Sequence, residues 1–306
     1  MQPRPASPIH VERSSRALRT LVVHTGGIGD FLLFCPCLLR LREEGPILLA
    51  GNRSRLNLAI VTGIAQEAFD LDDIGFDSVF SEPSAKLRSV LSRVERAIIW
   101  MKDDGTIRDA FHACGVKDVR TFPGLPPEGW VRHASEYYSE CLGLECLPPL
   151  RLPIEAGDTP HDVLIHPGSG GARKNWPLEH FAAVAERLTQ AGRQVEWCAG
   201  PAEEGLRLPP DARLVETPAV MSLARELAGT TDYLGNDSGA THLAAACGCR
   251  TVAVFGPTDP RVWAPRGDNV TVLAGAPWPE VDEVVAALLR PGEPPPPPDA
   301  NTPPIP

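Results

Sequence analysis

The sequence predicts an α/β protein of two domains, each with a mainly parallel β-sheet flanked by helices. Two observations support this fold class. Short apolar strands alternate with helical segments along the chain, and the series begins again after a proline- and glycine-rich stretch, Leu147 to Pro160. The length of 306 residues and the hydrophobic content of 43% suit two domains of ordinary size. We therefore expect domains at residues 17–150 and 161–290.

The first half opens with a buried strand, Thr20 to His24, a glycine turn, and an apolar helix from Phe31 to Arg42. We expect Pro36 near the first turn of this helix, where proline is tolerated. Further strands are expected at Ile47–Ala50, Phe76–Phe80 and Ala97–Trp100, and further helices at Asn52–Val61, Ser84–Ser92, Ile107–Cys114 and His133–Leu142. Residues 1–16 are expected to form a flexible N-terminus.

The second half repeats the pattern, with a strand at Val163–His166 and a helix that opens at Trp176. Strands are also expected at Gln194–Ala199 and Thr251–Phe255, and helices at Met221–Ala228, Thr241–Cys247 and Val284–Leu289. Residues 291–306 are rich in proline, so we expect a disordered tail there.

The composition excludes several classes of protein. A net charge of −10 and a pI near 5.3 argue against a nucleic-acid-binding protein that depends on a basic surface. The eight cysteines show neither a CxxC pair nor a zinc-finger spacing, which indicates free thiols in a reducing compartment. No apolar leader is present, and the longest apolar run is too short to span a membrane. The sequence thus predicts a soluble, cytoplasmic protein.

Polar turns follow three of these strands and a further apolar run that ends at Tyr233-Leu234. The turns are at Gly26–Asp30, Pro167–Lys174, Gly235–Gly239 and Gly256–Thr258. Open α/β sheets bind ligands at the carboxyl ends of their strands, and the N–H groups of a following helix favour a phosphate. Simpler interpretations stay open for each turn. The side chains of Asp237 and Ser238 can serve only as helix caps, and the second turn can be a solvated loop.

The first turn is a poor dinucleotide-binding fingerprint. Gly27 and Gly29 supply the first two glycines of GxGxxG, but Leu32 stands at the third position. Asp30 either complements the helix dipole or directs a carboxylate into a cleft. Glu203 and Glu204 follow a strand, where a carboxylate can bind ribose hydroxyls or simply lie on the surface.

In combination, these segments resemble the glycosyltransferase family 9 enzymes, typified by the lipopolysaccharide heptosyltransferases. The resemblance is strong over residues 162–265 and thin elsewhere, where it depends mainly on Asp30. It rests on the Gly-x-Gly-Asp turn that ends at Asp30, on His166-Pro-Gly-Ser with Lys174-Asn-Trp-Pro177, on Met221-Ser-Leu, on Asn236-Asp-Ser-Gly-Ala-Thr-His242, and on Phe255-Gly-Pro-Thr-Asp-Pro260.

The resemblance implies a GT-B fold, in which two Rossmann-like domains face each other across a cleft. It implies an inverting transfer without a metal or other cofactor, from a nucleotide-diphospho-sugar such as ADP-heptose to a glycan or glycolipid acceptor. Asp30 would be the general base, and Lys174 would stabilise the leaving diphosphate. The implied donor-binding residues are Ser169, Gly170, Lys174, Glu203, Glu204, Met221, Asp237, Ser238, Gly239, His242, Gly256 and Thr258.

The resemblance places the acceptor on the N-terminal domain, near Gly27, Gly29, Arg53 and Arg55. These arginines, with Lys86, Arg88 and Arg93, suit an anionic acceptor of the lipopolysaccharide-core type at the inner membrane surface, but a solvated basic face explains them equally well. Two other functions stay open. One is a non-catalytic GT-B nucleotide-binding or scaffold protein, and the other is a Rossmann-type NAD-dependent oxidoreductase.

Overall fold

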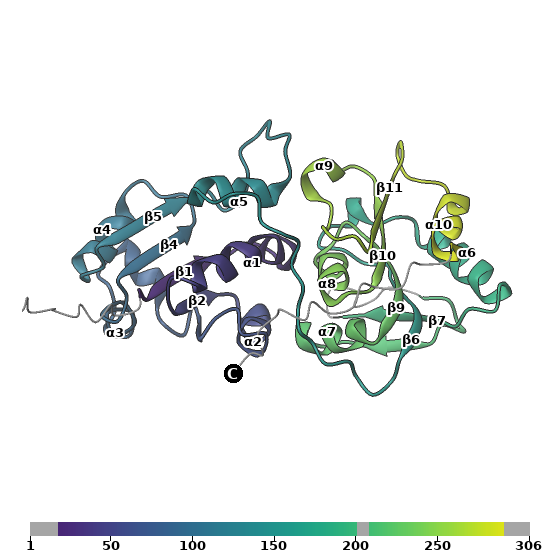
Figure 1. Cartoon of the computed structure of the whole chain (residues 1–306), viewed down its shortest axis with the longest axis horizontal. Coiled ribbons are helices and arrows are strands. Elements are labelled where there is room, and N and C mark those ends of the chain that lie inside the picture. Colours follow the sequence, from purple (N-terminus) through teal and green to yellow (C-terminus); the bar gives the residue numbers. More distant parts are fainter. Residues whose placement is uncertain (1–17, 201–207, 291–306) are drawn as a thin grey trace, which may run out of the picture.

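The computed structural model describes residues 18–200 and 208–290, which form two α/β domains joined by an extended segment (Figure 1). The expected termini, residues 1–16 and 291–306, lie outside the described residues. The elements in chain order are β1 (Thr20–His24), α1 (Ile28–Arg42), β2 (Ile47–Gly51), α2 (Arg53–Val61), β3 (Glu67–Asp70), η1 (Phe76–Phe80), α3 (Ala85–Leu91), β4 (Arg96–Trp100), α4 (Thr106–Ala113), β5 (Asp118–Phe122), α5 (Ala134–Leu142), β6 (His161–His166), η2 (Ala172–Lys174), α6 (Leu178–Gln190), β7 (Val195–Ala199), β8 (Leu214–Glu216), α7 (Val220–Ala228), β9 (Thr230–Asn236), α8 (Gly239–Cys247), β10 (Arg250–Phe255), α9 (Pro260–Trp263), β11 (Val270–Ala274) and α10 (Val281–Leu289).

Both sheets are parallel, as predicted. The first has five strands in the order β3-β2-β1-β4-β5, and the second has six in the order β11-β10-β9-β6-β7-β8. The central strands β1, β2 and β4 are buried along their whole length, which explains their continuous apolar runs. In each domain the carboxyl ends of the strands share one edge of the sheet, so the polar turns that follow them gather there.

Two of the predicted local features are wrong. Residues Phe76–Phe80 form the short 3₁₀ helix η1 and not a strand, because Gly75 before them takes a left-handed conformation that starts a tight turn. The edge of the sheet is formed instead by β3, which pairs with β2. Pro36 lies in the interior of α1, because this helix starts at Ile28.

The two domains share a continuous hydrophobic core. One cluster of buried side chains includes Phe34 and Leu38 of α1 together with Leu243 of α8. Helix α1 packs against α8, and α2 packs against α7. The contact between α1 and α8 is closest at two glycines: a Cβ atom on Gly239 would lie 2.9 Å from Cβ of Ile28, and one on Gly29 would lie 3.0 Å from Cδ2 of His242. Small residues thus let the two helix N-termini meet.

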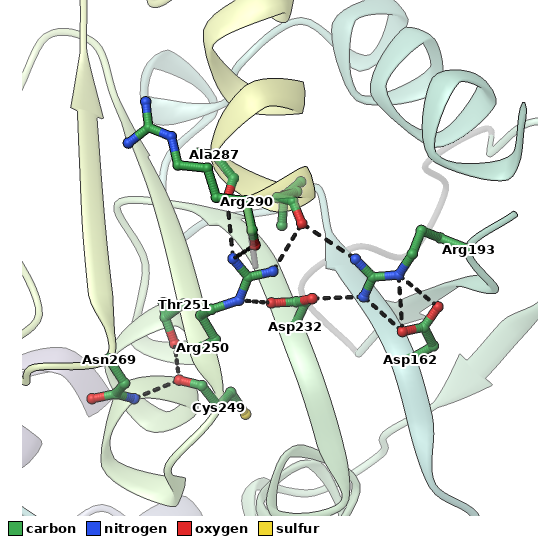
Figure 2. A network of polar contacts seen from close by, with 10 residues as sticks. Asp162, Arg193, Asp232, Cys249, Arg250, Thr251, Asn269, Ala287 and Arg290 are labelled. Atoms are coloured by element: carbon green, nitrogen blue, oxygen red, sulfur yellow. Dashed lines mark hydrogen bonds and ion pairs between the residues drawn. The ribbon is translucent and has the colours of Figure 1, made fainter. Parts of the chain in front are cut away.

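The amino ends of the second sheet carry an ion-pair network (Figure 2). Asp232, only 1% exposed, lies between the guanidinium groups of Arg193 and Arg250. Both arginines also donate to the carbonyl of Leu288 at the end of α10, where the helix dipole favours cations. The network fixes α10 to the sheet, and it lies at the end of the strands opposite the polar turns.

All eight cysteines are free thiols, and Cys35, Cys37, Cys198 and Cys249 are buried. Within residues 18–200 and 208–290, no helix has the length and apolarity needed to cross a bilayer.

Candidate active site

Asp30 lies in the first turn of α1, directly after the glycine turn that follows β1. The backbone N–H of Gly27 donates a 2.8 Å hydrogen bond to Oδ2 of Asp30, and Gly27 is the N-cap of the helix. Burial raises the pKa of Asp30 from its ordinary value. The Gly27 hydrogen bond and the positive charges of Lys174 and Arg55 act in the opposite direction. The carboxyl group is therefore held in place by its own turn, with no direct ion pair among the described residues.

Asp237 has a different environment, across the domain interface. It follows β9 and is buried, and its Oδ2 atom accepts hydrogen bonds from Nζ of Lys174 at 2.7 Å and from Oγ1 of Thr258 at 2.8 Å. The lysine comes from η2 and the threonine from the turn after β10. The structure thus brings together three residues that the sequence had placed on three separate turns.

Asn236 organises the loop that contains Lys174. Its buried amide donates to the carbonyl of Pro167 at 2.8 Å, and its Oδ1 accepts from the backbone N–H of Trp176 at 2.8 Å. One side chain thus holds both ends of the loop 167–176. In the sequence, Asn236 stands out only as part of a family motif, although a buried asparagine at the end of a strand is a typical anchor for a neighbouring loop.

The hydroxyl groups expected to bind the donor are engaged locally in this structure. Oγ of Ser169 lies 2.6 Å from Oδ1 of Asn175 and 2.9 Å from the carbonyl of Gly171. Ser238 is the N-cap of α8, and its Oγ accepts from the N–H of Thr241. Gly170 borders open space, since a Cβ atom there would meet nothing within 4 Å. The loop therefore presents a backbone edge that a ligand can approach.

His242 lies at the contact between the two domains. It is buried in α8, and its ring packs against Gly29 of α1. The pKa of His242 is lowered to about 4, mainly by burial. The charge of Asp237 opposes this shift, and those of His133 and Lys174 add to it. The imidazole is therefore neutral at physiological pH.

The other predicted site residues lie around this centre or away from it. Met221 is half-buried in the first turn of α7, and Gly256 is covered by the ring of Trp278. Arg53 is exposed and forms ion pairs with Asp70 and Asp73. Arg55 is buried behind the Gly26–Asp30 turn. Glu203 and Glu204 lie outside the described residues.

The comparison with known families concerns the domain that contains Lys174 and Asp237. A family model described as Glycosyltransferase family 9 (heptosyltransferase) matches residues 153–286. Residues 153–286 are therefore similar to the family 9 glycosyltransferases. This domain includes the loop 167–176 and the turns after β9 and β10, while Asp30 lies outside the match.

Relatives of known function support the family assignment. The chain is 34% identical over 145 residues to lipopolysaccharide heptosyltransferase 1 of Escherichia coli O18:K1:H7. The aligned region covers 45% of this chain and 43% of the relative. It is 31% identical over 137 residues to lipopolysaccharide heptosyltransferase 3 of E. coli K12, and this alignment covers 41% of this chain and 40% of the relative. These alignments span less than half the length of each relative.

Solved structures extend the similarity to both domains at the level of the fold. E. coli ADP-heptose LPS heptosyltransferase II superimposes with a TM-score of 0.71 over 89% of this chain and 99% of that chain, at 18% identity. E. coli heptosyltransferase WaaC with ADP gives a TM-score of 0.62 over 87% and 98%, at 16% identity. The protein has the GT-B fold, and the domain that is similar to family 9 is the C-terminal of the two.

The described residues of the two domains contain no group of three or more His, Cys, Asp or Glu side chains that could hold a metal ion. One structural neighbour, TibC of enterotoxigenic E. coli, is described as iron-containing, with a TM-score of 0.58 at 16% identity.

Proposed function

We propose that this protein is an inverting glycosyltransferase that moves a sugar from a nucleotide-diphospho-sugar to a hydroxyl of a lipopolysaccharide-core-type or other glycan acceptor. Heptose is the proposed sugar and ADP-heptose the proposed donor. The observation that carries the proposal is the close contact between the first turn of α1, which contains Asp30, and the start of α8, which follows Asp237: a Cβ atom on Gly239 would lie 2.9 Å from Cβ of Ile28. Lys174 belongs to the same side of the interface, because it is bonded to Asp237. One domain offers a base and the other a phosphate-binding cation.

In the proposed reaction, Asp30 removes the proton of the acceptor hydroxyl as its oxygen attacks the anomeric carbon. The bond between that carbon and the diphosphate oxygen breaks, and the nucleoside diphosphate leaves from the opposite face, which inverts the anomeric configuration. Burial raises the pKa of Asp30, which makes this carboxylate a stronger base than an exposed aspartate.

The donor diphosphate would bind to the carboxyl ends of the second sheet. We propose that Lys174 turns from Asp237 to the diphosphate, and that backbone N–H groups at Ser169–Gly170, Ser238–Gly239 and Gly256–Thr258 complete the site. Met221 would pack on the base, His242 would face the diphosphate, and Glu203 or Glu204 would bind the ribose. Support comes from the structures of WaaC with ADP and with ADP-2-deoxy-2-fluoro heptose, which have this fold.

The acceptor would bind on the N-terminal side, near Gly27, Gly29 and Arg53. An anionic group on the acceptor could replace Asp70 and Asp73 as partners of the exposed Arg53 guanidinium. We propose that transfer proceeds without a metal and takes place in the cytoplasm at the inner membrane surface.

Calorimetric titration with ADP, UDP, GDP, ADP-heptose and NAD tests the donor assignment. We expect ADP and ADP-heptose to bind and the other nucleotides to bind at least about tenfold more weakly, a difference of about 1.4 kcal/mol. ADP-heptose binding without ADP release toward any core acceptor would favour the non-catalytic scaffold. Binding of NAD alone would favour the oxidoreductase.

A further inference from the structure

Arg55 is a buried arginine that forms hydrogen bonds with the turn before Asp30. It belongs to α2 and is only 3% exposed. Its NH1 group donates to the carbonyl of Gly26, and its NH2 group donates to the carbonyl of His24 at 3.3 Å. These two carbonyls end β1 and begin the turn. The guanidinium thus fixes the backbone from which Asp30 projects.

Burying this cation is costly, and its surroundings offset the cost only in part. Arg55 lies in the first turn of α2, where the helix dipole disfavours positive charge. Among the described residues it forms no direct ion pair, although its guanidinium lies 5.9 Å from the ring centroid of Phe31. Burial lowers the pKa of Arg55, and the charge of Asp30 is the larger of the two effects that oppose this. A buried charge with so little compensation suggests a role beyond stability.

We propose that Arg55 is a positioning residue for Asp30: it fixes the Gly26–Asp30 turn through two carbonyl groups and supplies a permanent positive charge behind the carboxylate. The proposal that this serves catalysis rests on the proposed role of Asp30 as the general base.

Charged and titratable groups from both domains surround Asp30. The N–H of Gly27 comes from its own turn, Lys174 from η2, Asp237 from the turn after β9, and Tyr138 from α5. His24 of β1 and His242 of α8 border the same turn, and burial lowers the pKa of His24 to about 3 and that of His242 to about 4, so both are neutral.

Of the two cations that act on Asp30, Lys174 is bonded to Asp237 and would turn to the donor diphosphate during the proposed reaction. Arg55 is held by backbone carbonyls and stays in place whether or not the donor is bound. It can therefore keep the carboxylate ionised and oriented while Lys174 is engaged elsewhere.

The test measures the ionisation of Asp30 directly, without any substrate. The full chain is labelled with ¹³C-aspartate, and the Asp30 carboxyl signal is identified by its loss in Asp30→Asn. We expect Arg55→Met to raise the titration midpoint of Asp30 by about half a pH unit or more, because an opposite charge is removed. Arg40→Met is the matched control: it removes a partly exposed arginine at the far end of α1 and should leave the midpoint unchanged. Equal midpoints in the two methionine variants would overturn the proposal.

Arg55→Lys distinguishes the positioning role of Arg55 from the effect of its charge. This variant also tests the proposal if Arg55→Met does not fold. Lysine keeps the charge but cannot hold both carbonyls in the same geometry. We expect its kcat with ADP-heptose to fall about tenfold or more, with the donor KM unchanged, because the base is displaced. An unchanged kcat would contradict the positioning role. Should Asp30→Asn itself keep full turnover, the base assignment fails, while the NMR titration still reports on Arg55.

Discussion

Asp30 lies in the first turn of α1 and Asp237 lies directly before α8, and the two helices meet at these ends across the domain interface. The surroundings of the two aspartates differ. Asp237 forms an ion pair with Lys174 within its own domain, and Lys174 and Thr258 both donate to one of its oxygens. Asp30 has a backbone N–H as its direct partner, and its nearest cations act on it without a hydrogen bond. Burial raises the pKa of Asp30.

This difference shows how one residue type can take two roles in a single site. A carboxylate that accepts hydrogen bonds from a cation and a hydroxyl is a weak base, and it holds those two groups in place. A partly buried carboxylate without an ion pair is a stronger base. Asp232, between two arginines at the other end of the sheet, shows the same residue used for stability alone.

The largest expected effect comes from Asp30→Asn. Turnover with ADP-heptose and a core-type acceptor should fall by about 10²–10⁴-fold, because the amide cannot accept the acceptor proton. The affinity for ADP, measured by calorimetry on the same sample, should change little. Parental turnover in this variant would show that Asp30 is not the base.

Removal of Lys174, the partner of Asp237, should weaken donor binding. Lys174→Ala should weaken ADP binding by about 10–100-fold, since a charge-assisted hydrogen bond contributes about 1.5–3 kcal/mol, and turnover should fall as well. Lys117→Ala, which removes an exposed lysine between α4 and β5, is the control. If Lys174→Ala binds ADP as tightly as this control does, Lys174 does not contact the donor.

A smaller effect is expected at Thr258. Thr258→Val keeps the side-chain shape but removes the hydroxyl that donates to Asp237, so we expect donor affinity to fall about fivefold, in line with about 1 kcal/mol for one hydrogen bond. Thr258→Ser retains the hydroxyl and should recover most of the affinity. Equal affinities of the valine and serine variants would show that the hydrogen bond to Asp237 does not support donor binding.

The smallest expected effect comes from His161, which pairs with two carboxylates and contributes to stability. His161 is buried between Glu196, at 2.5 Å, and Glu226, at 2.8 Å. Burial alone would lower its pKa, but the two carboxylates outweigh burial and raise it. The stability from this contact is therefore present below the ordinary histidine pKa and is lost as pH rises through the raised value.

His161→Asn should accordingly lower the Tm by about 2–4 °C at pH 6, and the deficit should shrink by pH 9. Turnover per folded molecule should not change, because His161 lies at the amino end of β6, away from Asp30 and Asp237. Differential scanning calorimetry at both pH values checks this. A deficit that is the same at pH 6 and pH 9 would mean that His161 is not charged in the folded protein.

Much of the fold could be predicted from the sequence, because the central strands are buried on both faces and so are continuously apolar. The missed strands were β3, β5, β8 and β11, none of which is fully buried. Strands of this kind lack a continuous apolar pattern, and their position is decided by pairing with a neighbour.

The candidate site was predictable as a set of turns but not as a set of contacts. The glycine, serine and lysine turns marked the carboxyl ends of the strands. The sequence could not show that Lys174 and Thr258 meet on the same oxygen of Asp237, since these residues are far apart in the chain and only the packed sheet brings them together. For the same reason Arg55, expected to face the acceptor, could not be placed behind the Gly26–Asp30 turn.

The pH dependence of kcat/KM with ADP-heptose tests the central claim most directly. We expect activity to rise with pH through a single acidic limb whose midpoint lies above the ordinary aspartate value, because Asp30 must be ionised and burial raises its pKa. His242→Asn is the control, because the pKa of His242 is lowered to about 4, and this variant should leave the limb in place. Activity that stays constant down to pH 4, or a limb that disappears in His242→Asn, would contradict the assignment of Asp30 as the base.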